Sequence, residues 1–284
     1  MTTITGDTIK LRPRFNQEID EKLMKKIGQC RKIIFNDYYN QDLPQLPNII
    51  THITFGIDYN KPIHNLPRSL IYLKMGRLFN NFVENLPDSL IYLEFDEWFC
   101  CRISYFPPAL QYLDLGHVYN YPLDNLPQSL KFLRLGNIFD NRITNIPASL
   151  EVLITGLNFS DPLFDLPYGI KFVVFSNSYR HSIQNLPDSI EVLAIGYFYC
   201  NDDDKYEGVY GERIKQYYWW LGKSEKITRL PKNLKYLYLH PSYQGIENIK
   251  AIFPNVIVST EKNVMLEWIY QNTSVTNVAI SARP

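Results

Sequence analysis

Histidine, cysteine and carboxylate side chains are the groups with which this chain could catalyse a reaction or hold a metal ion. The histidines are His52, His64, His117, His181 and His240, and the cysteines are Cys30, Cys100, Cys101 and Cys200. No nucleophilic triad, zinc-ligand pair or phosphate-binding glycine loop occurs among them. Asp202, Asp203 and Asp204 lack the alternating spacing and terminal glutamate of a calcium loop. The sequence therefore predicts no catalytic residue, no metal site and no cofactor.

Aromatic and charged side chains that recur along the chain are the candidates for binding a partner. The aromatic row holds Tyr72, Tyr92, Tyr112, Phe132, Phe172 and Tyr236, and the charged row holds Lys74, Glu94, Asp114 and Arg134. The charged row continues with Ile154, Val174 and Ala194, so its second half is apolar. Extended apolar stripes on a surface mark interaction sites, and tyrosine is enriched at interfaces. We expect both rows to be exposed and to contact a protein partner.

A second interpretation of these rows needs no partner. Aromatic side chains on neighbouring strands stabilise a sheet by ~0.2–1 kcal/mol per pair. The apolar half also fits a surface that is covered by another segment or by a second copy of the chain. Both interpretations stay open from the residues alone.

The elements that position the rows follow from an internal repeat. Leu-Pro, or a close variant, returns every 20 residues at positions 46, 66, 86, 106, 126, 146, 166 and 186. A fixed period in this range is typical of stacked repeat proteins, in which each coil contacts only its neighbours. Proline rules out a long helix through this stretch of each coil. We expect turns or short 3₁₀ segments on the outer side.

Each repeat begins with a short strand. Leu73 and Met75 alternate with Tyr72 and Lys74, which is the period-2 pattern of a strand with one face in the core. A glycine follows the strand in most coils, and we expect it to adopt positive φ and turn the chain out of the strand. These glycines are Gly56, Gly76, Gly116, Gly136, Gly156 and Gly196.

Two further columns recur in each coil. One aromatic per coil predicts a buried, stacked spine, and it runs through Tyr39, Tyr59, Phe79, Phe99, Tyr119, Phe139, Phe159, Tyr179 and Tyr199. Asn40, Asn60, Asn80 and Asn120 follow the spine. Their amides are expected to bond backbone groups of neighbouring coils.

The L-x-x-L-x-L frame resembles a leucine-rich repeat. The longer unit, with Tyr59-Asn60-Lys61-Pro62-Ile63 as its closest example, resembles the FNIP repeat of giant DNA viruses and social amoebae over about residues 30–240. The resemblance implies a right-handed solenoid with one short parallel strand per coil, and an interaction protein. Relatives with an F-box suggest target recruitment for ubiquitylation. No F-box is found in the first 40 residues, so that role would need another chain.

The chain is expected to form one solenoid of roughly 11–12 coils between two caps. Residues 1–29 hold an amphipathic helix over 17–29 that covers the first coil, and the first strand is Lys32–Phe35. Regular repeats occupy 30–200, and an insertion occupies 201–228. The last repeats and the C-terminal cap occupy 229–284, with a helix at Val264–Tyr270 and a strand over 275–280. The insertion is interpreted either as a surface loop or as part of a functional face.

Composition limits the classes of partner. The formal net charge is zero and the pI is near 7, so no electrostatic footprint for nucleic acid is present. No signal peptide or transmembrane run is seen, so we expect no membrane partner. The cysteines are expected to be reduced, buried thiols of an intracellular protein, in the host cytoplasm if the chain is viral.

The function predicted from the sequence is a non-enzymatic scaffold. It would bind a protein partner, whose identity is unknown, through the strand-lined face. The alternative is a structural or self-assembling homo-oligomer formed through the apolar half of that face and the insertion.

Overall fold

The computed structural model describes residues 2–163, 165–176, 179, 181–196, 227–239, 243 and 245–260. Several expected features lie outside the described residues. They are the insertion up to residue 226, Tyr199, Cys200, His240, the helix at Val264–Tyr270 and the strand over 275–280.

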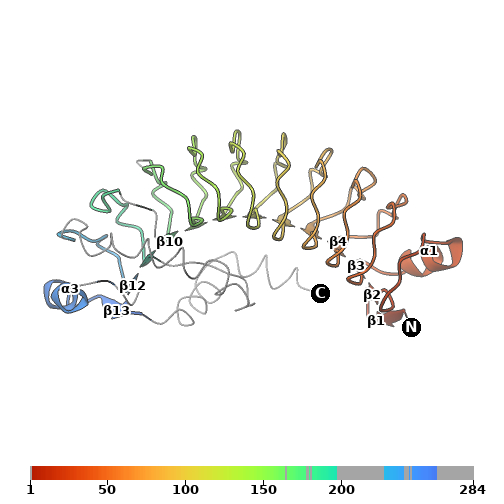
Figure 1. Ribbon diagram of the computed structural model, residues 1–284, viewed down its shortest axis with the longest axis horizontal. Coiled ribbons are helices and arrows are strands. Elements are labelled where there is room, and N and C mark those ends of the chain that lie inside the picture. The colour runs from red at the N-terminus through yellow and green to blue at the C-terminus, as the bar shows by residue number, and fades with distance from the viewer. Residues whose placement is uncertain are drawn as a thin grey trace.

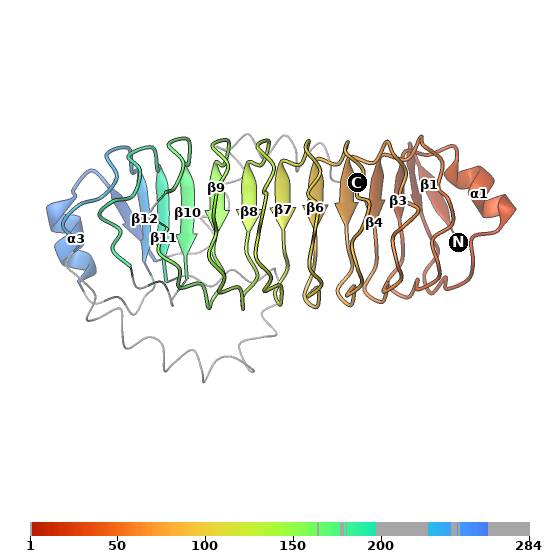
Figure 2. The same cartoon turned by 90° about the horizontal axis from the view of Figure 1, so that it is seen from above.

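The described part of the chain forms one sheet of 13 strands in sequence order. Figures 1 and 2 show an arch in which the strands line the concave side and the connecting turns form the outer side. Only the first pair of strands is antiparallel, and all other pairs are parallel. The strands are β1 Thr3–Thr5, β2 Thr8–Lys10, β3 Lys32–Ile34, β4 His52–Thr54, β5 Tyr72–Lys74, β6 Tyr92–Glu94, β7 Tyr112–Asp114, β8 Phe132–Arg134, β9 Val152–Ile154, β10 Phe172–Phe175, β11 Val192–Ile195, β12 Tyr236–Leu239 and β13 Ile257–Ser259.

The register of the sheet follows the 20-residue period of the sequence. Tyr72 pairs with Tyr92, and Leu73 pairs with Leu93 in the same ladder. The expected leucine-rich-repeat-like solenoid with one short parallel strand per coil is confirmed. Residues at equivalent positions of successive coils therefore lie beside one another, as the two rows require.

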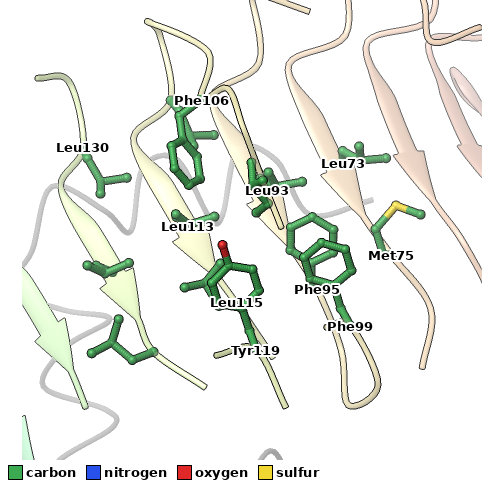
Figure 3. Close-up of a cluster of buried hydrophobic side chains, with 14 of the residues drawn as sticks. Leu73, Met75, Leu93, Phe95, Phe99, Phe106, Leu113, Leu115, Tyr119 and Leu130 are labelled. Atoms are coloured by element: carbon green, nitrogen blue, oxygen red, sulfur yellow. The ribbon is translucent and has the colours of Figure 1, made fainter. Parts of the chain in front are cut away.

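The core lies between the strands and the outer turns. Leu73 and Met75 are completely buried there. The aromatic spine is confirmed for the described residues, because Tyr39 to Phe159 are at most 1% exposed and successive rings stack about 6 Å apart. Figure 3 shows Phe99 and Tyr119 of the spine beside Phe95 and the strand leucines.

Asparagine and serine side chains join neighbouring coils, as expected for the asparagines. Asn40 Oδ1 accepts the backbone N–H of Asn60 at 2.9 Å, and Asn60 Oδ1 accepts that of Asn80 at 2.9 Å. The hydroxyl of Ser69 donates to the carbonyl of Ile50 at 2.7 Å. These bonds satisfy backbone groups of turns that form no regular ladder.

In most coils, the glycine after the strand is needed for a reason other than the expected one. Gly116 and Gly196 adopt positive φ, as expected, but Gly56, Gly76, Gly136 and Gly156 do not. A Cβ on Gly76 would lie 1.7 Å from the carbonyl oxygen of Gly56. Glycine is required there because two coils approach closely, and not because of its φ angle.

The N-terminal end contains more sheet than the sequence analysis predicted. The antiparallel hairpin β1–β2 precedes β3, so the expectation that Lys32 begins the first strand is wrong. Gly6, with φ of 59°, forms the turn of this hairpin. The short Thr-Ile-Thr and Thr-Ile-Lys runs lie outside the repeat, which is why the repeat pattern did not reveal them.

Each end of the sheet carries a helix. Helix α1, Glu21–Ile27, lies inside the predicted 17–29 segment, and Asp20 Oδ1 caps it by accepting the N–H of Leu23 at 2.7 Å. Ile27 enters the core, and Leu23 and Met24 pack against it, as predicted. Helix α3, Ile246–Ile252, was not predicted. Among the described helices, none is long and apolar enough to cross a membrane.

Candidate interaction face of the sheet

The two predicted rows lie on the face of the sheet opposite the core. Their buried members form two clusters separate from the main core, one around Tyr72 and Tyr92 and one from Phe132 to Tyr238. We call this surface the concave face, because the strands line the inner side of the arch (Figure 1). Every predicted binding residue is on this face.

The aromatic row is a continuous stack through the middle of the concave face. Ring centroids are 4.4 Å apart for Tyr72 and Tyr92, and 4.1 Å apart for Tyr92 and Tyr112. Tyr112 and Phe132 follow at 4.2 Å. These distances match the spacing of strands in a sheet, so the rings cover each other's faces.

The charged row is paired within itself. Lys74 Nζ lies 2.7 Å from Glu94 Oε1, and Arg134 Nε lies 2.7 Å from Asp114 Oδ1. The hydroxyl of Tyr92 donates to Glu94 Oε2, so the two rows are linked. The N–H of Gly116 donates to Asp114 Oδ1 at 3.0 Å. The four charges thus form two oppositely charged pairs across adjacent strands.

Burial changes the proton affinities of these groups. Burial raises the pKa of the Asp114 carboxyl to about 6, although the Arg134 guanidinium opposes the shift. Burial also raises the pKa of the Tyr92 and Tyr112 hydroxyls. For Lys74, burial alone would lower the pKa of the amine, but the carboxylates of Glu94, Asp96 and Asp114 together outweigh burial and leave that pKa raised.

The expectation that both rows are exposed is wrong for most of their members. Asp114 and Arg134 are each 3% exposed, and the other buried members are Tyr72, Tyr92, Phe132, Phe172 and Glu94. Tyr112 and Tyr236 are half-buried, and the Lys74 side chain is 38% exposed. A sequence column gives the direction of each side chain and not its exposed fraction.

The apolar continuation of the charged row is the most buried part of the concave face. Ile154 is 1% exposed, and Val174, Ala194 and Tyr238 are fully buried. The same holds for Val152, Phe172 and Val192 in the neighbouring row. This half-face therefore offers no exposed apolar surface to a second copy of the chain.

The two predicted rows did not include the side chains of the first strands of the concave face. Lys32 pairs in register with His52 and then Tyr72, and Lys10 begins the column that leads through Thr54 to Lys74. Lys10 is exposed, and Lys32 and Thr54 are half-buried. The 20-residue period would have placed Lys32 and Thr54 in the two rows, but Lys10 lies outside the repeat.

A different set of apolar side chains is exposed on the turns. Trp98 is 53% exposed, and Leu78 and Ile138 occupy the same position of other coils at 42% and 40%. They lie just after the strands and before the spine residue of each coil. We call these three side chains the outer row, and the sequence analysis did not single them out.

The histidines and cysteines do not converge on a reactive site in the described residues. Burial, with the Lys32 charge, lowers the pKa of His52 to about 4, and burial with Arg134 does the same for His117. No three His, Cys, Asp or Glu side chains of the described ranges group as metal ligands. Cys30 is a buried thiol as expected, but Cys100 is exposed and Cys101 half-buried.

Comparison with known proteins agrees with the repeat. The FNIP repeat family matches residues 39–77, 59–97 and 103–138. A search of curated proteins finds no match.

Two solved structures are similar to the chain. CroV588, a circular leucine-rich-repeat protein of a giant virus, is 28% identical over 80% of this chain, with a TM-score of 0.59. This chain spans only 36% of the CroV588 chain. YopM from Yersinia enterocolitica WA-314 is 19% identical over 75% of this chain and 52% of that chain, with a TM-score of 0.42. The chain is a leucine-rich-repeat-like solenoid, and its residues 39–97 and 103–138 are similar to the FNIP repeat.

Proposed function

We propose that the chain is a non-enzymatic scaffold that binds a protein partner through the concave face. The observation that supports this most directly is that stacked aromatic and charged side chains occupy this face and take no part in the main core. Leucine-rich-repeat solenoids present such strand-lined faces as extended binding surfaces. Similarity to the giant-virus protein CroV588 supports a virus–host role.

An adaptor that recruits targets to a ubiquitin ligase is one form of this function. It would require a second chain to provide the ligase contact. The homo-oligomer alternative loses its apolar contact surface, because Ile154, Val174 and Ala194 are buried. Binding of a different protein through the concave face is therefore the function that we propose.

The test uses a displayed library of random peptides selected on the immobilised full chain. Thr54→Trp places a large uncharged side chain on the concave face without removing a core contact, because Thr54 is half-buried there. Thr144→Trp is the matched control, since Thr144 is exposed on an outer turn. We expect selected peptides to lose binding to Thr54→Trp and to keep binding to Thr144→Trp.

A third variant separates the concave face from the outer row. Trp98→Ser removes the most exposed side chain of that row. Peptides that bind Thr54→Trp normally but fail to bind Trp98→Ser would contradict the proposal and assign recognition to the outer row. Selection of no peptide that responds to Thr54→Trp would also contradict it.

A further inference from the structure

The concave face is open to solvent at its two ends: at β13, where Ile257 is 57% exposed, and over the N-terminal strands. On β1 and β2, Thr3, Thr5 and Lys10 are exposed. Lys32 on β3 and Thr54 on β4 are half-buried. The exposed fraction of the charged row then falls from 38% at Lys74 to 10% at Glu94 and 3% at Arg134. A partner that contacts this face can reach the side chains of β1–β5.

All charged side chains that β1–β5 place on this open end are lysines. The register puts Lys10 and Lys74 in one column and Lys32 in the neighbouring one. The remaining positions hold threonine, Ile34, and the buried His52 and Tyr72. The nearby carboxylates are Asp7, in the β1–β2 turn, Glu94, which is paired with Lys74, and Asp96 and Asp114, whose charges also act on Lys74.

The N-terminal cap adds to this positive charge. Residues 1–34 contain eight lysines and arginines against four aspartates and glutamates, whereas the whole chain has 29 of each. Clustered charge of one sign attracts oppositely charged partners and orients their approach. The neutral net charge of the chain therefore hides a basic N-terminal end, and the concave face is open at this end.

We propose that the open end of the concave face, over β1–β5, binds an acidic segment of the protein partner. The inference rests on the proposed function and adds the chemistry of the partner. Lys10 and Lys74 are three strands apart in one column, which corresponds to ~14 Å at the usual strand spacing. An extended segment crossing the strands covers that distance in about four residues. Two carboxylates of that segment, four positions apart, would contact Lys10 and Lys74. The residues of the segment between them would lie over Ile34 and Thr54.

The test measures fluorescence anisotropy of a fluorescein-labelled peptide in which glutamate alternates with serine. The variant Lys10→Glu/Lys32→Glu reverses two charges on the open end. Arg68→Glu/Arg142→Glu changes the net charge equally at two exposed outer positions and is the matched control. We expect the lysine variant to weaken binding about tenfold or more and the control to weaken it less than about twofold. Added salt should weaken binding to the wild type.

Several outcomes would overturn the inference. They are equal binding of a peptide with glutamine in place of glutamate, equal loss in the two double variants, and binding of a labelled poly(U) RNA in preference to the acidic peptide. Circular dichroism of both variants checks that they are folded, as expected because none of the four residues is buried.

The failure of this inference is distinguishable from the failure of the proposed function. Selected library peptides that respond to Thr54→Trp but carry no acidic residues would preserve binding through the concave face and overturn the acidic partner. Selected peptides that ignore Thr54→Trp would overturn both.

Discussion

Two regions near opposite ends of the concave face, β2–β5 and β9–β12, have the same backbone and opposite surroundings. Over β2–β5 the side chains of the charged row are Lys10, Ile34, Thr54 and Lys74, and none of them is buried. Over β9–β12 the same row holds Ile154, Val174, Ala194 and Tyr238, and all are buried. The parallel ladder fixes the position of each side chain in the row. The residue types of the row differ between the two regions, and so does their exposure to a partner.

The largest expected effect comes from placing a charge at each end. Val174→Asp puts a carboxylate at a completely buried position and should lower the free energy of unfolding by about 5 kcal/mol. Thr54→Asp, at the open end, should change it by less than about 0.5 kcal/mol. Urea unfolding followed by circular dichroism measures both. Similar values for the two variants would remove the contrast between the ends.

The two ion pairs test where along the charged row the side chains become buried. Arg134→Met leaves Asp114 buried without its cation and should cost about 3–4 kcal/mol. Lys74→Met removes a partly exposed partner of Glu94 and should cost less than about 1 kcal/mol. Equilibrium unfolding of the two variants gives the difference. A larger cost for Lys74→Met would place the boundary nearer the N-terminus.

A smaller effect is expected where the aromatic and charged rows join. Tyr92→Phe keeps the ring in the stack but removes the hydroxyl that donates to Glu94. We expect a loss of about 1–2 kcal/mol in the free energy of unfolding. Tyr72→Phe is the same change one strand earlier and serves for comparison. A negligible effect of Tyr92→Phe would show that Lys74 alone satisfies the Glu94 carboxylate.

A pH dependence of the free energy of unfolding, with opposite signs, is expected at two buried positions. His52 has its pKa lowered from 6.5 to about 4, so its contribution to stability is present above pH 6.5 and is lost as the pH falls towards 4. Asp114 has its pKa raised from 3.8 to about 6, so its contribution is present below pH 3.8 and is lost as the pH rises through 6.

Unfolding of His52→Gln and Asp114→Asn between pH 4 and pH 6.5 separates the two contributions. The stability of the wild type relative to His52→Gln should increase with pH, and relative to Asp114→Asn it should decrease. A rise relative to Asp114→Asn would mean that Arg134 outweighs burial and holds Asp114 ionised.

The sequence by itself determined the solenoid. The 20-residue period, the alternation of Leu73 and Met75 with Tyr72 and Lys74, and one aromatic per coil allow a single register, because a slip of one residue would expose the core face. The asparagine bonds between coils follow from the same spacing.

Only the tertiary structure decided which parts of that solenoid are accessible. The burial of Asp114 and Arg134 depends on pairing across strands, and the requirement for Gly76 depends on a carbonyl of the preceding coil. The β1–β2 hairpin brings Lys10 beside Lys32 from outside the repeat. A periodic pattern specifies the direction of each side chain, whereas accessibility depends on neighbours that only the folded chain brings together.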